Sequence, residues 1–329
     1  MVNCGNTVVF SCVCLVLLFA VGCGRQQQQH AVDLYVDAVM LAEQNNTAEA
    51  VEKLNSAVAM DRDFSIAYSL LGDIYCQMQD YEKSAASYES ATRLNPWSFK
   101  AYFSLGRVYE AMKKFAFAVK AYARACELGP GNLGAHVGAA KSYYQIKDYG
   151  NALLYGKRAE QINPDVGELQ KMLGDIYESR EDYDHAISYY KRALEIDSYN
   201  PQIMQALGVV YLKTGRNEPA KELLSGVVES DPENGPAHRY LGYCYLQLGE
   251  LDKAVESYSR AAEIDKKDWD AYRGLGVAYM LQARKEDGTM DETLKAKAIQ
   301  QWRISLDLRP DQPNSKKLVR LIKKYSGRQ

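Results

Sequence analysis

The sequence has little net charge, because 40 lysines and arginines face 42 aspartates and glutamates in 329 residues. A nucleic-acid-binding protein needs a basic stripe, so this balance excludes that class and no nucleic-acid partner is expected. Histidine is also scarce: its 4 residues are scattered, and none has a second histidine three or four positions away. We therefore expect no metal site, no cofactor, no small-molecule substrate and no catalytic residue, and the chain is predicted not to be an enzyme.

The cysteines give no disulfide framework. Of the 7 cysteines, Cys4, Cys12 and Cys14 lie near the N-terminus, and a fourth, Cys23, follows the apolar stretch there. The other three, Cys76, Cys126 and Cys244, are far apart on positions with helical periodicity. We expect them to be thiols packed in the interior and not disulfide partners.

The sequence does contain a strong internal repeat with a period of 34 residues. The segment Leu71-Gly72-x-x-Tyr75 returns in register along most of the chain. Its glycine position holds Gly72, Gly106, Ala140, Gly174, Gly208, Gly242 and Gly276, and its tyrosine position holds Tyr75, Tyr109, Tyr143, Tyr177, Tyr211, Tyr245 and Tyr279. Length alone favours two domains of roughly 150 residues. The repeat overrules that estimate, because stacked repeats bury one continuous core.

Each period contains two apolar stripes with helical spacing. Residues at i, i+3, i+4 and i+7 share one face of a helix, so Tyr68, Leu71 and Tyr75 form the first stripe. Ser84, Tyr88 and Ala91 form the second stripe. The polar break between the stripes is short, which predicts an antiparallel helix pair. Glycine where the two helices meet permits a close approach, and the large ring of the second helix is expected to fill the gap.

In period and in signature residues the array resembles the tetratricopeptide-repeat (TPR) family. The resemblance implies an all-α fold, a right-handed superhelical solenoid of antiparallel helix pairs with a C-terminal capping helix. The expected organisation is a degenerate repeat over 31–64, six units over 65–268, a seventh over 269–312 with an insertion around 285–293, and a capping helix and tail over 313–329.

The resemblance also implies the function, a non-enzymatic scaffold that binds a peptide or protein on its concave face. Because the first helix of each pair lines that face in the family, the expected partner-binding residues are Lys100, Phe103, Arg107, Lys141, Tyr144, Lys171, Asp175, Arg239, Tyr240, Tyr243 and Arg273, with Ser69, Asp73, Gln205 and Leu246 as further candidates. Aromatic rings interleaved with basic groups suit an extended peptide or a partner helix. The clamp for terminal carboxylates found in some family members is not expected, because Asp175 would repel that group.

The N-terminus resembles that of a bacterial lipoprotein. Residues 8–22 are apolar and uncharged, which is the length of a signal-peptide core and short of a membrane span. Small residues then precede Cys23, as in a lipobox, so we expect a signal peptide over 1–22, lipidation of Cys23 and a flexible, lipid-anchored tether over 23–30. The resemblance implies export to the cell envelope, with the outer membrane preferred because Gly24 is not aspartate. An uncleaved hydrophobic anchor is the alternative.

Three interpretations of function remain open at the level of sequence. The first is an adaptor that docks envelope proteins, in the manner of TPR lipoproteins of pilus assembly, secretion or cell-wall complexes. The second is a regulatory or catalytic subunit whose chemistry lies in the insertion at 285–293. The third is a membrane-tethered hub inside the cell.

Overall fold

The computed structural model describes residues 26–327, and the chain divides into one unit that ends at Asn163 and a second that begins at Pro164. Each unit is described by itself. The first contains a helical segment over 26–43 followed by α2 (Thr47–Met60), α3 (Ser65–Gln77), α4 (Tyr81–Leu94), α5 (Phe99–Ala111), α6 (Phe115–Leu128), α7 (Leu133–Gln145) and α8 (Tyr149–Ile162). The second contains α9 (Gly167–Ser179), α10 (Tyr183–Ile196), α11 (Pro201–Lys213), α12 (Asn217–Ser230), α13 (Gly235–Leu248), α14 (Leu251–Ile264), α15 (Trp269–Gln282), α16 (Glu292–Leu308) and α17 (Ser315–Tyr325).

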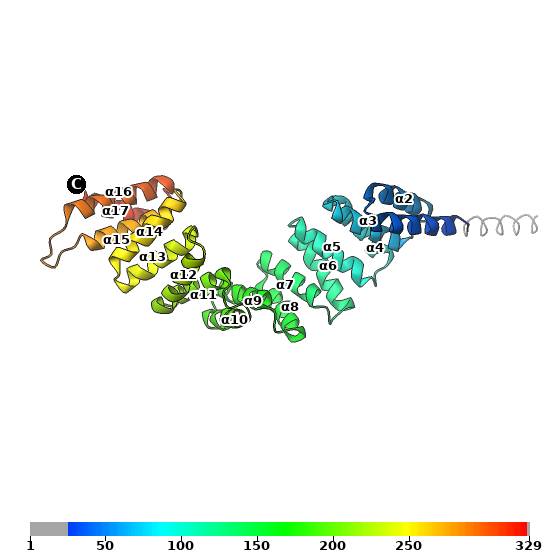
Figure 1. Ribbon diagram of the computed structural model, residues 1–329, viewed down its shortest axis with the longest axis horizontal. Helices are drawn as coiled ribbons and strands as arrows, with labels where there is room; N and C mark the ends of the chain where they lie inside the picture. Colours follow the sequence, from blue (N-terminus) through cyan, green and yellow to red (C-terminus); the bar gives the residue numbers. More distant parts are fainter. Residues whose placement is uncertain (1–25, 328–329) are drawn as a thin grey trace, which may run out of the picture. The chain divides into compact units, whose positions relative to one another are not determined.

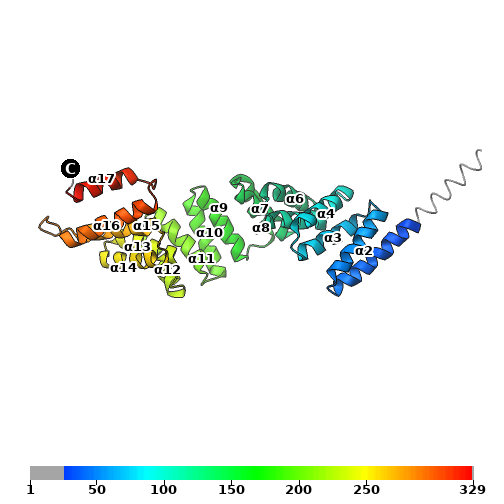
Figure 2. The same ribbon diagram turned by 90° about the horizontal axis from the view of Figure 1, so that it is seen from above.

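Consecutive helices pack as antiparallel pairs, as Figures 1 and 2 show within each unit. We call the first helix of a pair helix A and the second helix B. Helices A are α3, α5 and α7 in the first unit and α9, α11, α13 and α15 in the second. Each helix A also contacts the helix A of the following pair in its unit. The predicted fold class, an all-α array of antiparallel helix pairs, is confirmed.

A ring from helix B fills the space above the glycine of helix A. A Cβ atom on Gly72 would lie 2.8 Å from the ring of Tyr88, and one on Gly174 would lie 2.6 Å from the ring of Tyr190. Cβ atoms in proteins do not come that close to other atoms, so beside such a ring only glycine fits at the position without a shift of the ring. In the repeat at 133–166 the smaller residue is on helix B instead: Ala140 is at the glycine position of helix A, and Gly156 is at the ring position of helix B. Ala140 is tolerated there because no ring presses on its methyl group.

Every turn from helix A to helix B in the 34-residue repeats passes through the left-handed backbone region. The residue at this position has a positive φ in each case: Gln79 (60°), Lys113 (57°), Lys147 (62°), Glu181 (60°), Gly215 (71°) and Gly249 (77°). The left-handed residue ends helix A and lets the chain reverse within three residues. Helix B often begins on a side-chain cap, as where the Asp80 carboxylate accepts from the Lys83 amide at 3.2 Å.

The last helix pair is longer than the others and is capped. The connection between α15 and α16 is a tight loop in which Lys285 N donates to Thr289 O at 3.0 Å, and Figures 1 and 2 show it extending away from the helices. The predicted capping helix is α17, which packs Leu318 and Ile322 against a cluster that includes Trp302 of α16. Its lysines and its single arginine, Lys316, Lys317, Arg320, Lys323 and Lys324, are exposed.

The three cysteines of the described part form no disulfide, as predicted. Cys126 and Cys244 are buried, and Cys76 is partly buried. Burial raises the pKa of both Cys126 and Cys244 to about 12, so both stay protonated and unreactive at neutral pH.

At the N-terminus the predicted tether is wrong over residues 26–30, which already belong to the first helix. Glutamine has a helix propensity close to that of lysine and glutamate, so a run of four favours helix over flexible coil. The predicted signal peptide (1–22) and lipidation site (Cys23) lie outside the described residues. Within 26–327, no helix is both long and apolar enough to cross a membrane.

The left-handed turns predict a stability change that depends on backbone conformation alone. Lys113→Gly is expected to raise the free energy of unfolding by about 1 kcal/mol, because glycine lacks the Cβ that makes a positive φ costly. The matched variant Gly215→Ala is expected to lower it by about 1 kcal/mol, since a Cβ there meets nothing within 4 Å and only the backbone is strained. Urea unfolding measures both. A loss of stability in Lys113→Gly contradicts this account of the turns.

Candidate binding site on the helices A

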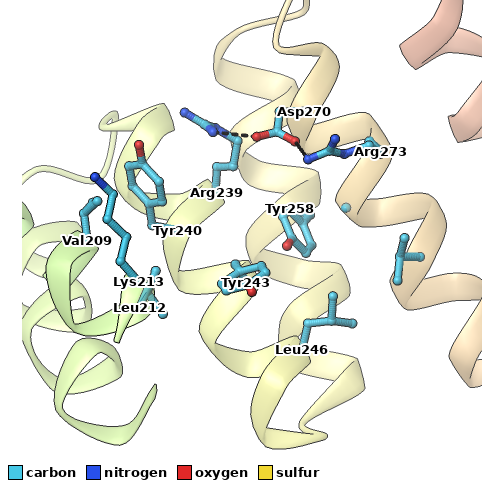
Figure 3. A pocket seen from close by; sticks show the side chains of 12 residues that line it. Val209, Leu212, Lys213, Arg239, Tyr240, Tyr243, Leu246, Tyr258, Asp270 and Arg273 are labelled. Atoms are coloured by element: carbon cyan, nitrogen blue, oxygen red, sulfur yellow. Dashed lines mark hydrogen bonds and ion pairs between the residues drawn. The ribbon is translucent and has the colours of Figure 1, made fainter. Parts of the chain in front are cut away.

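The second unit has a pocket of about 430 Å³ formed by three successive helices A (Figure 3). The helices α11, α13 and α15 supply most of its lining, and the Tyr258 ring reaches it from α14, a helix B. The lining residues are Val209, Leu212, Lys213, Arg239, Tyr240, Tyr243, Leu246, Tyr258, Asp270, Arg273, Gly274 and Val277. Aliphatic and aromatic side chains with a few convergent polar groups are typical of binding sites.

Ion pairs hold the basic groups of this pocket in place. Asp270 joins two arginines: its carboxylate lies 2.9 Å from Arg239 Nη1 and 2.5 Å from Arg273 Nη2, as Figure 3 shows. Arg239 Nε also lies 2.9 Å from Asp268, a charge contact without the alignment of a hydrogen bond. A guanidinium has five N–H donors, so both arginines retain donors for a ligand.

The two arginines also lie over aromatic rings. The Arg239 guanidinium is 4.8 Å from the centroid of the Tyr240 ring, and that of Arg273 is 5.1 Å from the Trp269 ring. Stacking fixes the planes of both groups, so less side-chain entropy is lost when they bind a ligand.

In three other repeats, the hydroxyl of the helix-B tyrosine emerges on the helix-A side and meets a carboxylate. Tyr88 donates to Asp73, Tyr122 donates to Glu110 at 2.8 Å, and Tyr190 donates to Asp175 at 2.7 Å and Glu178 at 2.9 Å. Burial raises the pKa of each of these hydroxyls and of the Tyr258 hydroxyl, so all four stay protonated and serve as donors.

The first unit has a hollow of about 510 Å³ between α3 and α5, and its lining includes a carboxylate. Asp73 lines this hollow beside Tyr88, and its second oxygen pairs with Lys100 Nζ at 2.7 Å. Arg107 lines the same hollow. The Tyr88 hydroxyl therefore has an acceptor inside the chain, in contrast to the Tyr258 hydroxyl of the pocket in the second unit.

The structure gathers four of the predicted partner-binding residues in one place and disperses the rest. Arg239, Tyr240, Tyr243 and Arg273 all line the pocket of the second unit, together with the further candidate Leu246. Within the first unit, only Arg107 of the predicted set lines the hollow. Their role in binding a partner stays a prediction.

Several predicted cations are engaged inside the chain. Lys141 Nζ lies 3.0 Å from Glu110, and Lys171 Nζ lies 2.7 Å from Asp175.

Two predicted aromatic residues pack against other rings of the first unit. Phe103 packs in the core of its repeat, with its ring centroid 5.6 Å from that of Phe99. Tyr144 lies beside Tyr149 with 5.8 Å between their ring centroids.

Sequence reasoning missed the other lining residues, which are Val209, Leu212, Lys213, Tyr258, Asp270, Gly274 and Val277. The prediction used only selected positions of helix A, so a ring from helix B was not considered. One sequence signal was available for Tyr258: its repeat has a tyrosine at the ring position but no carboxylate nine or twelve residues into helix A.

Each unit is thus a stack of antiparallel helix pairs with a hollow lined mainly by its helices A, which is the architecture of a helical-repeat interaction protein. Models of the tetratricopeptide repeat match residues 103–167, 137–201 and 178–241, and a TPR repeat model matches 72–113 and 227–282. These matches together span 72–282, and the chain belongs to the tetratricopeptide-repeat family of protein-interaction scaffolds.

Solved structures show the same fold at low sequence identity, and no curated protein matched the chain. The C-terminal part of a TPR protein from Cytophaga hutchinsonii is 18% identical, with a TM-score of 0.60 over 73% of this chain and 99% of that one. A TPR protein from Parabacteroides merdae is 15% identical, with a TM-score of 0.56 over 78% and 98%. YrrB, described as a TPR protein with an unusual peptide-binding site, is 22% identical, with a TM-score of 0.52 over 63% and 99%.

The different surroundings of the buried tyrosines predict different costs for removing a hydroxyl. Tyr190→Phe leaves Asp175 and Glu178 without their shared donor, so it is expected to lower the free energy of unfolding by about 1–3 kcal/mol. Tyr258→Phe removes no hydrogen bond within the described residues and is expected to cost less than about 0.5 kcal/mol. Urea unfolding of the two variants tests this difference, and equal losses contradict it.

Proposed function

We propose that this protein is a non-enzymatic scaffold that binds a segment of a partner protein in the pocket formed by α11, α13 and α15. The observation that carries the proposal is the pocket itself, where four predicted contact residues meet around a volume of about 430 Å³. Rings supply buried area, and guanidinium groups supply directional hydrogen bonds to a peptide. The peptide-binding site described for YrrB, a protein of the same fold, is consistent with such a role.

The proposal includes a location, the bacterial cell envelope, reached through a lipid on Cys23. Its support is the apolar segment 8–22 followed by small residues and then Cys23. The first helix includes residue 26, so the helical array begins only a few residues after the anchor. Gly24 in place of aspartate favours the outer membrane where a cell has two. A scaffold in this position would hold its partner close to the membrane.

Site-specific photo-crosslinking tests the binding face. With a photoreactive phenylalanine analogue at Tyr243, which is exposed in the pocket, we expect a discrete adduct with one partner protein in intact cells. The matched control carries the analogue at Lys191, an exposed residue of helix B α10 in the same unit, where no such adduct is expected. Adducts of equal yield at both positions, or none at either, contradict binding at this pocket.

Metabolic labelling tests the anchor. Cys23→Ser is expected to abolish incorporation of radioactive palmitate and to release the protein from the membrane fraction, because it removes the thiol to which the lipid would be attached. Cys76→Ser is the control and is expected to retain both label and membrane association. Persistent membrane association of Cys23→Ser would instead favour an uncleaved hydrophobic anchor.

A further inference from the structure

The helix-B tyrosines and the helix-A carboxylates occur together. The three repeats that pair a tyrosine with a carboxylate have an aspartate at the ninth residue of helix A, a glutamate at the twelfth, or both. Two repeats replace the tyrosine, with Gly156 and Leu224, and neither has a carboxylate at those positions. Tyrosine and carboxylate therefore act as one unit, because a buried hydroxyl needs a partner and the carboxylate needs a donor.

The repeat over 235–268 departs from this rule. It keeps the tyrosine as Tyr258, yet the ninth and twelfth residues of its helix A are Tyr243 and Leu246. Only 3% of the Tyr258 surface is exposed. Its hydroxyl makes no hydrogen bond within residues 26–327, and the oxygen itself is open to solvent. Tyr258 nevertheless lines the pocket, beside Tyr243 in Figure 3. The chain thus keeps the tyrosine hydroxyl but omits the acceptor that the other repeats provide, and the hydroxyl opens into the pocket.

The cations that accompany the acceptor in other repeats have counterparts in the pocket. Lys100 accompanies Asp73, and Lys171 accompanies Asp175. Arg239 occupies in its own helix A the position that Lys171 occupies in α9, and Arg273 occupies the same position in the next helix A. Lys213, Arg239 and Arg273 line the pocket together with Asp270. Lys213 also pairs with Glu178 and Arg239 with Asp268, so the charges balance, but each guanidinium keeps N–H groups that can donate to a ligand carboxylate.

We propose that the pocket binds the side-chain carboxylate of an aspartate or glutamate in the partner segment. The ligand carboxylate takes the place that Asp73, Glu110 and Asp175 hold in the other repeats and accepts from the Tyr258 hydroxyl and from Arg239 or Arg273. An apolar side chain next to it in the segment packs on Val209, Leu212 and Val277 at the floor. The proposal rests on peptide binding by this pocket and adds the chemistry of the ligand.

A library of short peptides with blocked termini tests the preference. Blocked termini leave the side chains as the only carboxylates. We expect the wild-type chain to enrich peptides that contain glutamate or aspartate beside a large apolar residue, and to bind such a peptide about tenfold more tightly than its glutamine analogue. Tyr258→Phe is expected to lose this acidic preference while still binding the apolar residue. Tyr190→Phe, whose lost hydroxyl is engaged inside the chain, is the matched control and is expected to keep it.

A second variant supplies the missing acceptor within the chain. Leu246→Glu puts a carboxylate at the position that Glu110 and Glu178 hold in other repeats, so it is expected to bind Tyr258 and abolish enrichment of acidic peptides. Leu246→Gln controls for the change in size and polarity, and it is expected to retain at least part of the acidic preference.

The outcomes separate the two proposals. Enrichment without an acidic preference, or an acidic preference unchanged by Tyr258→Phe, overturns the carboxylate assignment and leaves peptide binding intact. No enrichment of any peptide by the wild-type chain overturns both.

Discussion

The contact between the helix-B ring and the helix-A glycine is the constraint on which the rest of this structure depends. A methyl group on Gly106 would lie 2.7 Å from the Tyr122 ring, and one on Gly138 of the next repeat would lie 2.5 Å from the same ring. One ring therefore sets the spacing within a pair and the spacing to the next pair. Because packed interiors leave few voids, a ring of fixed size gives each pair nearly the same geometry, and the array follows.

The contact between the tyrosine ring and the glycine also links the packing of the core to the proposed binding site. A tyrosine that fills the core between two helices A brings its polar end to their outer side, where it needs an acceptor. In most tyrosine-bearing repeats the chain supplies that acceptor, and the helix-A face there is closed by internal hydrogen bonds and ion pairs. At Tyr258 helix A supplies no acceptor, and the tyrosine lines a pocket. Two side chains, Tyr243 and Leu246 at the carboxylate positions, thus separate the repeat that carries the proposed binding site from the repeats that satisfy their own tyrosine.

The fold could be predicted from sequence because its signals are local and recur. A helix pair needs only a 3.6-residue period, a short turn and a small residue opposite a large one. Each of these signals can be recognised within a single 34-residue repeat. The site was less predictable. Arg239 joins Asp270 across 31 positions, and Lys213 joins Glu178 across 35, so these partners become neighbours only after the helices stack. The prediction of tether over 26–30 was wrong because composition alone does not separate a polar helix from a polar coil.

The sequence by itself determined the all-α class, the repeat and the helix A residues that face outward, because these follow from periodicity along the chain. Tertiary structure decided which of those residues remain available. Stacking paired Lys100 and Lys141 with carboxylates of the preceding helix A. It left the Tyr258 hydroxyl without an acceptor inside the described part of the chain and placed Arg239, Arg273 and Lys213 around the same pocket. The physical reason is that charge and hydrogen-bond partners are set by distance in space, and only the packed helices fix those distances.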